Sequence, residues 1–256
     1  MLFARYMGVA GTAFLLVYVV FRRRWFYAKI QQRFPKNRDY FREIAYSFLT
    51  IGVFTLVGLS IFKGPLAPYK RWYESIGDAA IQIGAFNDGG WGYWLLSVLI
   101  MILVHDAYFY WTHRAMHHRQ LYRYVHLVHH KSTNPTPLAA FAFHPIEAFV
   151  EAGIFYVIVF TIPAHHSAFI AFFFFMMFFN VYGHLGYELY PKGWTRHPFG
   201  KWLNTSVNHN MHHHHFNGNY GLYFTWWDRW MGTTHPDYFE RYDEVKQRKS
   251  PITQHS

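Results

Sequence analysis

The sequence predicts an all-α integral membrane protein with about four to five membrane helices, two of them in a short hairpin, and a cytoplasmic cap of histidine-rich helices. Hydrophobic residues make up 52% of the 256 positions and charged residues only 15%, whereas soluble proteins carry about 25% charged residues. Long uncharged runs recur along the chain, and 19 histidines lie mostly between and after them. The runs predict membrane helices, and the histidines predict a polar cap on one membrane face.

The first three membrane helices follow from three apolar runs. Residues 6–21 carry no charge and are followed at once by three arginines, residues 22–24. A secretory signal peptide places its positive charges before the apolar run, so we expect a retained anchor. Residues 46–62 form a second run, and residues 91–111 a third that only His105 and Asp106 interrupt. Because a spanning helix needs about 20 apolar residues, the shorter runs predict short or tilted helices.

A hairpin is predicted for the fourth apolar segment, residues 152–181. This segment is too long for one span and has Pro163, His165 and His166 in its middle. Proline interrupts a helix because it lacks a backbone N–H. We therefore expect two short helices that return the chain to the side from which it entered.

The charges of the connecting loops predict the orientation. Residues 22–45 hold eight basic and two acidic residues, residues 63–90 hold three of each, and residues 112–147 hold four basic residues and one acid. Since cytoplasmic loops carry the excess of Lys and Arg, the first and third loops face the cytoplasm and the second faces out. The hairpin then leaves residues 182–256 on the cytoplasmic side. A bacterial inner membrane and the endoplasmic reticulum both fit this topology.

The composition also excludes several classes of function. The absence of cysteine excludes disulfides, zinc–thiolate sites and iron–sulfur clusters. The net charge of +10 is compatible with nucleic-acid binding, but the basic residues follow the sidedness of the loops. We therefore expect the bilayer, and no nucleic acid, as the partner of these charges.

Three histidine clusters carry spacing that is typical of metal ligands. They are His113 with His117, His126 with His129 and His130, and His209 with His212 and His213. On a helix, positions i, i+3 and i+4 lie close together on one face, so their imidazoles can converge on a metal ion. Eight nitrogens exceed what one ion uses, which favours two ions. Imidazole sites suit Fe, Zn, Cu or Ni rather than Mg or Ca.

A carboxylate precedes the first cluster within the same membrane helix. Asp106, Tyr110, His113 and His117 fall on one helical stripe, and a buried membrane carboxylate usually has a function. We expect Asp106 to support a ligand, by accepting an imidazole N–H or through Tyr110 or a water. The alternative is that Asp106 pairs with an arginine or caps a polar pocket.

Two further histidines are candidate ligands. His144 is followed three residues later by Glu147, which is a candidate to orient it. His184 follows Asn180 at i+4, where the hairpin returns to the cap. We expect the remaining histidines to be non-ligands, in the membrane, at the hairpin tip, isolated or at the surface: His105, His118, His165, His166, His197, His214, His215, His235 and His255.

The motifs together resemble the fatty acid hydroxylase superfamily, also called the sterol desaturase family. The resemblance rests on residues 106–117, 126–132, 135–137, 144–147, His184, 209–213 and 216–233, in family order. The resemblance covers about residues 91–235, the expected catalytic core of a single membrane domain over 1–256. The apolar helices of 1–90 precede this core, and the polar tail of mixed charge, 236–256, is expected to be a surface extension. The eight clustered histidines would be iron ligands, with His144 and His184 added.

The resemblance also implies the chemistry. Members of this family use two iron ions, dioxygen and two electrons to hydroxylate or desaturate a sterol, fatty acyl or sphingoid lipid. Because the chain has no dinucleotide-binding glycine motif, a separate electron donor is implied, a cytochrome or ferredoxin with its NAD(P)H reductase. Zinc binds such sites more tightly than ferrous iron and can replace it in a purified sample.

Other classes of metalloprotein remain as alternatives. A zinc protease would carry a His-Glu-x-x-His motif, and no His-Glu dipeptide occurs here. A haem carrier would place single histidines on facing helices. A non-catalytic or hydrolytic zinc protein shares the histidine pattern, and the two classes differ in whether oxygen-dependent lipid oxidation occurs.

Overall fold

The structure is a computed structural model that describes residues 2–74, 76 and 90–248. Four of the described helices are long and apolar enough to cross a membrane: Leu2–Val20, α3 (Asn37–Lys63), α4 (Trp91–Met116) and α8 (His166–Gly183). Each matches one of the predicted apolar runs. The predicted helical membrane fold is therefore confirmed.

The first helix is wound unevenly. It consists of α1 (Leu2–Tyr6), η1 (Met7–Gly11), α2 (Thr12–Phe14) and η2 (Leu15–Val20), in which η1 and η2 have π-helical hydrogen bonding. A short 3-10 turn, η3 (Phe26–Ala28), follows and leads into α3. The Tyr6 hydroxyl donates to the Leu138 carbonyl at 2.8 Å. This helix is therefore tied to the segment that follows His130.

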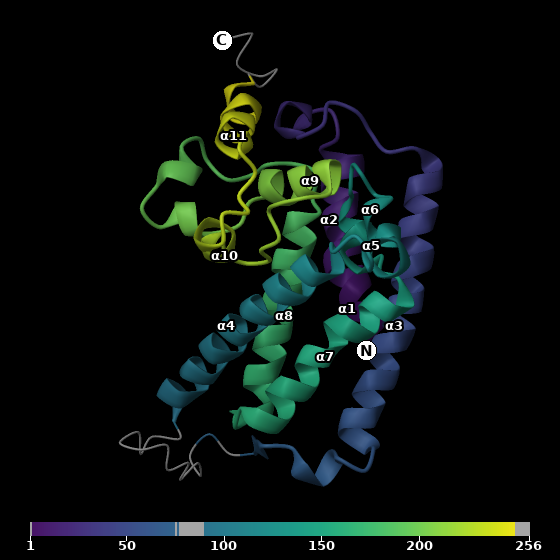
Figure 1. Cartoon of the computed structure of the whole chain (residues 1–256), viewed down its shortest axis with the longest axis vertical. Coiled ribbons are helices and arrows are strands. Elements are labelled where there is room, and N and C mark those ends of the chain that lie inside the picture. The colour runs from purple at the N-terminus through teal and green to yellow at the C-terminus, as the bar shows by residue number, and fades with distance from the viewer. Residues whose placement is uncertain (1, 75, 77–89, 249–256) are drawn as a thin grey trace.

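The predicted hairpin consists of α7 (Pro145–Thr161) and α8. Its tip contains the two-residue strand β2 (Ala164–His165), which pairs in parallel with β1 (Trp72–Tyr73). The imidazole of His165 accepts from the Ser167 N–H at 3.2 Å and so begins α8. In Figure 1, α4, α7 and α8 run side by side, with α3 along the outer edge.

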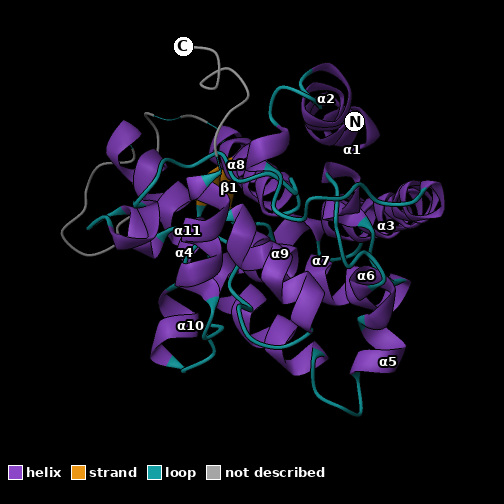
Figure 2. Ribbon diagram, turned by 90° about the horizontal axis from the view of Figure 1, so that it is seen from above, coloured by secondary structure: helices purple, strands orange, loops and turns teal. Residues whose placement is uncertain are grey.

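Short helices form a cap over one end of this bundle. They are α5 (Tyr122–Val125), α6 (Leu127–His130), η5 (Pro137–Phe141), η6 (Trp194–Arg196), η7 (Gly200–Trp202), α9 (Ser206–His215), α10 (Trp226–Trp230) and α11 (Tyr238–Gln247); η4 (Ala67–Tyr69) lies between α3 and β1. Seen from above, α9 lies over the middle of the bundle, with α10 and α11 on one side and α5 and α6 on the other (Figure 2).

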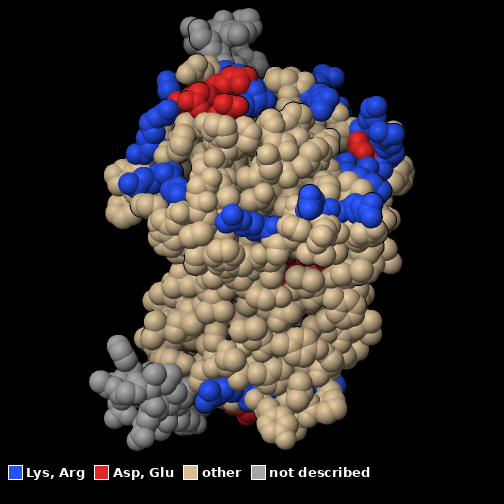
Figure 3. Space-filling view, in the orientation of Figure 1, with Lys and Arg blue, Asp and Glu red and all other residues tan. Residues whose placement is uncertain are grey.

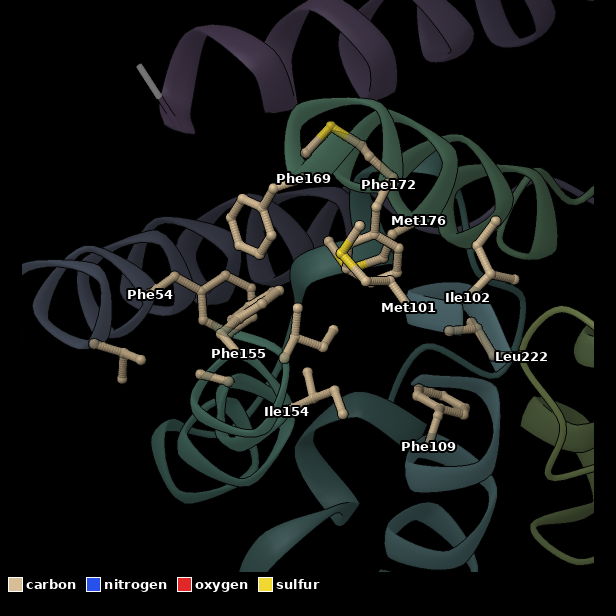
Figure 4. Close-up of a cluster of buried hydrophobic side chains, with 14 of the residues drawn as sticks. Phe54, Met101, Ile102, Phe109, Ile154, Phe155, Phe169, Phe172, Met176 and Leu222 are labelled. Carbon is tan, nitrogen blue, oxygen red and sulfur yellow. The ribbon is translucent and has the colours of Figure 1, made fainter. Parts of the chain in front are cut away.

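The core of the bundle is largely aromatic. Figure 4 shows Phe54 of α3, Phe155 of α7 and Phe169 and Phe172 of α8 facing one another. Phe155 lies 6.4 Å from Phe54 and 6.2 Å from Phe169 between ring centroids. Such edge-to-face pairs add to the stabilisation that burial provides.

The outer faces of the same helices are apolar and exposed. Leu56 of α3, Leu95 of α4 and Phe174 of α8 have half or more of their surface uncovered. Figure 3 shows a belt with almost no charged side chains, and Lys and Arg gathered mainly at the end that carries the cap. An uncharged belt of this kind is what a bilayer surrounds, and the chain is a membrane protein.

The C-terminal segment differs from the expected polar extension. Its helix α11 buries Tyr238, Tyr242 and Val245 against Val207 and Met211 of α9. The three residues recur at helical spacing, so the charged positions between them form the solvent face. The tail therefore holds α9 in place.

Part of the loop 63–90, which was expected on the opposite membrane face, lies outside the described residues. The same is true of His255.

Candidate metal centre

Nine of the ten predicted ligand histidines form two clusters beneath the cap. The first cluster contains one ring nitrogen each from His113, His117, His126, His130 and His212, and the second one each from His129, His184, His209 and His213. Within each cluster these nitrogens lie within 4.8 Å of one another.

Within each cluster, the Nε2 atoms lie at distances that suit a shared cation. In the first cluster, His126 Nε2 is 3.0 Å from His113 Nε2 and 3.1 Å from His130 Nε2. In the second, His184 Nε2 is 3.0 Å from His209 Nε2 and 3.3 Å from His129 Nε2. Two metal–nitrogen bonds of about 2.0–2.1 Å at roughly a right angle give about 3 Å between the nitrogens.

The two histidine triads divide between the clusters, whereas the sequence suggested that each triad converges on one ion. His126 and His130 enter the first cluster and His129 enters the second; on α9, His209 and His213 enter the second and His212 the first. The reason is helical geometry. Positions i and i+4 differ by about 40°, while i+3 lies about 100° from i+4, so the i+3 ring turns away to the other cluster.

Four of these rings are held by hydrogen bonds from Nδ1. His113 Nδ1 lies 2.9 Å from the Tyr220 carbonyl and His184 Nδ1 lies 2.8 Å from the Asn180 carbonyl. His212 Nδ1 lies 2.7 Å from the Gly218 carbonyl. Since a carbonyl only accepts, each Nδ1 carries the proton and each Nε2 presents its lone pair to the cluster.

The fourth ring is held by a carboxylate. His126 Nδ1 lies 2.7 Å from Glu147 Oε1, and both side chains are almost completely buried. The sequence suggested that Glu147 orients His144, but its closest histidine partner is His126. A carboxylate behind an imidazole raises the basicity of the nitrogen that faces the metal.

Burial keeps these imidazoles neutral. Loss of solvent lowers the pKa of His184 to about 4. The pKa values of His129 and His209 fall well below the ordinary range, first because of burial and then because of neighbouring histidines. Neutral imidazole is the form that binds a metal ion.

One buried nitrogen tests whether a cation fits. His212 donates from Nδ1, and its Nε2 is buried with no hydrogen-bond partner among the described residues. Buried polar atoms normally have a partner. A cation in the first cluster would supply one, so the residues present fit a transition-metal ion with nitrogen ligands.

His144 lies outside both clusters. Its ring Nδ1 accepts from the backbone N–H of Ile146 at 3.3 Å, and its backbone N–H donates to Glu147 Oε2 at 3.4 Å. With Pro145 next, this forms the capping box that begins α7. The expectation that His144 is a metal ligand is not met, because its ring is used as a helix cap.

Asp106 also has a different role from the expected contact with an imidazole. Its Oδ1 accepts from the Tyr223 and Phe224 N–H groups at 2.9 and 3.3 Å, and its Oδ2 accepts from Trp226 Nε1 at 2.8 Å. Asp106 therefore caps the loop before α10. The same loop supplies the Tyr220 carbonyl that holds His113.

Tyr110 also supports the loop before α10. Within the described residues it has no hydrogen bond to a histidine of either cluster. Its hydroxyl pairs with Thr233 Oγ1 at 3.0 Å and accepts from Arg114 at 3.1 Å. Thr233 in turn donates to Asp228 at 2.7 Å.

Sequence reasoning missed the role of Asp228. This carboxylate accepts from the Tyr220 and Gly221 N–H groups, each at 2.8 Å, and so fixes the loop whose carbonyl holds His113. In the sequence this residue could have been noticed as an acidic side chain among tryptophans 226, 227 and 230. The backbone carbonyls of Gly218 and Tyr220, which accept from His212 and His113, could not have been noticed, because no side chain in the sequence marks them.

The histidines that were expected to be non-ligands lie outside both clusters wherever they are described. His118, His214 and His215 are exposed, and His165 caps α8. His105 is buried and pairs through Nδ1 with the Tyr223 hydroxyl at 2.7 Å.

A narrow apolar cavity adjoins both clusters. Its lining includes Phe109, whose ring centroid is 4.9 Å from that of His113, and Phe143, whose ring centroid is 5.0 Å from that of His129. Of the aromatic run at 169–179, Met176 lines the cavity while Phe174 and Phe178 are exposed on the outer face. The cavity thus lies in the bundle core, one aromatic ring away from each histidine cluster.

Comparison of the sequence with known proteins finds one matching family. Residues 98–233 match the family model described as fatty acid hydroxylase. The chain is 32% identical over 230 residues to a Delta(7)-sterol 5(6)-desaturase of Gibberella zeae, covering 87% of this chain and 65% of the relative. It is 32% identical over 200 residues to lathosterol oxidase of Rattus norvegicus, covering 78% of this chain and 62% of the relative.

A third relative is a Delta(7)-sterol 5(6)-desaturase of Aspergillus fumigatus, 29% identical over 239 residues, with 86% of this chain and 69% of the relative covered. The chain thus spans about two thirds of the length of these curated relatives. No solved structure matches it.

Proposed function

Because the chain belongs to the fatty acid hydroxylase family, we propose that it is a membrane oxidoreductase that hydroxylates or desaturates a lipid in a dioxygen-dependent reaction. The observation that carries the proposal is the pair of buried histidine clusters beside an apolar cavity. An unactivated C–H bond resists acids, bases and nucleophiles, so the reaction needs a metal rather than an arrangement of side chains.

We propose one ion in each cluster, with iron as the working metal. The first ion would be held by His113, His117, His126, His130 and His212, and the second by His129, His184, His209 and His213. When bound, a pair of iron ions supplies the oxidation of the C–H bond with dioxygen and two electrons.

The protein itself positions the ligands and excludes water. Glu147 and the carbonyls of Tyr220, Gly218 and Asn180 fix four rings with Nε2 toward the metal sites. The aromatic lining of the cavity keeps water from the reacting carbon. The catalytic core spans about residues 91–235, within one membrane domain.

The metal centre faces the cytoplasm in this proposal. Lys and Arg gather at the end of the molecule that carries the cap (Figure 3), which the positive-inside rule assigns to the cytoplasm. An electron donor, a cytochrome or ferredoxin served by an NAD(P)H reductase, would approach this basic end. The bilayer would supply the lipid.

A sterol is the substrate class we favour over fatty acyl and sphingoid lipids. The support is the activity named for two relatives, a sterol desaturase and lathosterol oxidase. The alternative is a non-catalytic or hydrolytic zinc protein, which the same imidazole donors would suit.

Metal analysis and turnover test the proposal. The protein is expressed in iron-supplemented, zinc-poor medium, purified in detergent and examined by elemental analysis and Mössbauer spectroscopy. We expect about two iron ions per chain, following the two ligand sets, and oxygen-dependent lipid oxidation that is lost in His129→Ala. Zinc alone, without iron uptake or oxygen consumption on reduction, would favour the zinc alternative.

A further inference from the structure

Helix α10 presents large apolar side chains on the outside of the cap. Trp230 is 62% exposed, and Met231, the residue after the helix, is 39% exposed. The ring of Trp230 stacks on that of Trp226, with 5.9 Å between centroids, and meets Trp227 edge to face at 5.6 Å. These four side chains form one surface, which we call the α10 patch. A clustered apolar surface, unlike a single exposed side chain, marks a place of contact with a partner.

The α10 patch adjoins a membrane helix. Trp227 packs against Trp111 of α4, with 5.9 Å between ring centroids and an interplanar angle of 68°. Trp111 is about half exposed, as are Leu99 and Leu103 earlier on the same helix. Figure 1 shows α10 low in the cap, near α4. The exposed apolar surface of a membrane helix is therefore continued by the α10 patch.

The length of α4 indicates the depth of this contact. The helix begins at Trp91, which is 70% exposed, and Trp111 follows 20 positions later. At 1.5 Å per residue the two tryptophans are about 30 Å apart along the axis, which equals the apolar thickness of a bilayer. Because a tilted helix covers less depth, Trp111 lies no farther out than the headgroup boundary when Trp91 lies at the opposite one. Tryptophan is enriched at both boundaries, so the adjoining α10 patch lies at headgroup level.

Basic side chains lie beside the same aromatic rings. Lys201 Nζ is 4.9 Å from the ring centroid of Trp202 on η7, and the guanidinium of Arg229 on α10 is 5.5 Å from it. On α4, the guanidinium of Arg114 is 6.0 Å from the ring centroid of Trp111. Long basic side chains lay their stems on apolar surface and direct the charge toward lipid phosphates. Aromatic and basic residues together are typical of a segment that lies in the membrane interface.

We propose that the α10 patch is seated in the headgroup region of the bilayer, so that the cap itself binds the lipid surface. A phospholipid surface is the partner because the patch continues the exposed side of α4 and has basic neighbours. The same short helix carries Asp228, which accepts from the Tyr220 N–H, while the Tyr220 carbonyl holds His113. Seating α10 in the interface therefore fixes a ring of the first histidine cluster relative to the membrane surface.

Spin labels on single cysteines test the proposal, since the chain has no cysteine of its own. Trp230→Cys and Met231→Cys are made in the full chain, labelled with a nitroxide and placed in phosphatidylcholine nanodiscs, where both membrane faces are open to solvent. For each label, the collision rate with oxygen, which concentrates in lipid, is compared with that of a water-soluble nickel chelate. Leu99→Cys on α4 is the lipid control, and Glu240→Cys on α11, also exposed, is the aqueous control.

We expect the labels at 230 and 231 to show a several-fold loss of nickel accessibility relative to the label at 240, with oxygen accessibility close to that at 99. Their depth should be about 5–10 Å, as for other interfacial segments. Nickel accessibility equal to that at 240 would place the patch in water and overturn the proposal. Low accessibility to both reagents would indicate a contact between proteins, which also overturns it. Met231→Cys leaves the tryptophan stack intact, so it decides the outcome if Trp230→Cys fails to fold.

Discussion

Glu147 accepts a hydrogen bond from His126 at 2.7 Å in a site from which solvent is almost completely excluded. The pair joins the beginning of α7 to the first histidine cluster. Because Glu147 also accepts from the His144 N–H, one carboxylate both starts the helix and orients a ring.

Replacement of Glu147 by leucine should weaken metal binding in the first cluster. The carboxylate fixes the proton of His126 on Nδ1, and loss of such a partner typically reduces metal affinity by about 10–100-fold. The measurement is the metal content of the protein after dialysis against increasing concentrations of a chelator. Glu240→Leu, at an exposed position of α11, is the control; equal retention by both variants would show that Glu147 does not support the site.

Neighbouring histidines should deplete different ions. His129 belongs to the second cluster and His130 to the first, so each single alanine variant is expected to lose about one ion per chain and to keep the other. Mössbauer spectra of the two variants should then differ from each other. His118→Ala, an exposed control in the same segment, should keep both ions. Identical spectra from His129→Ala and His130→Ala would argue against two separate ligand sets.

Loss of Asp106 should destabilise the cap. Alanine at this position leaves the Tyr223 and Phe224 N–H groups and Trp226 Nε1 without their acceptor, at a cost of about 1–3 kcal/mol for each unsatisfied buried group. We expect a lower thermal midpoint in detergent. A midpoint equal to that of the unchanged protein would mean that water replaces the carboxylate.

Lys29 should give the stability a pH dependence on the alkaline side. This lysine is fully buried beside the rings of Tyr18, Phe34 and Tyr187, and burial, partly offset by Glu43, lowers its pKa from 10.5 to about 7. Between these pH values the unfolded chain binds more protons than the folded chain, so the free energy of unfolding rises with pH.

The test compares Lys29→Met with the unchanged protein between pH 7 and 9. The variant should unfold at a higher temperature at pH 7, because no amine has to be discharged, and its midpoint should rise less with pH. A variant that is less stable than the unchanged protein at pH 7 would instead show that the charged amine stabilises the fold.

The sequence predicted the membrane helices because their signal is local. The uncharged run at 46–62, for example, lies within α3, whose two ends carry the charged residues Asp39 and Lys63. The clustering of the histidines was also predictable, since their number and spacing are unusual. The tail was expected to be a polar surface extension, and the side chains that α11 buries were missed because its many charges conceal the helical spacing of Tyr238, Tyr242 and Val245.

The supporting contacts were less predictable because they depend on tertiary structure. Asp106 lies on the same stripe as His113, yet its partners come from residues more than a hundred positions later. His144 carries a ligand-type side chain, but Pro145 makes it the start of a helix. The carbonyl of Tyr220 acts through the backbone, so only the folded loop identifies it.

The division of each histidine triad has a consequence for how the centre fills. The turn at 126–130 and helix α9 each contribute histidines to both clusters, so helix geometry governs the separation between the two clusters. Any adjustment that seats one ion also moves ligands of the other. The affinity of each cluster for its ion should therefore depend on whether the other cluster is filled.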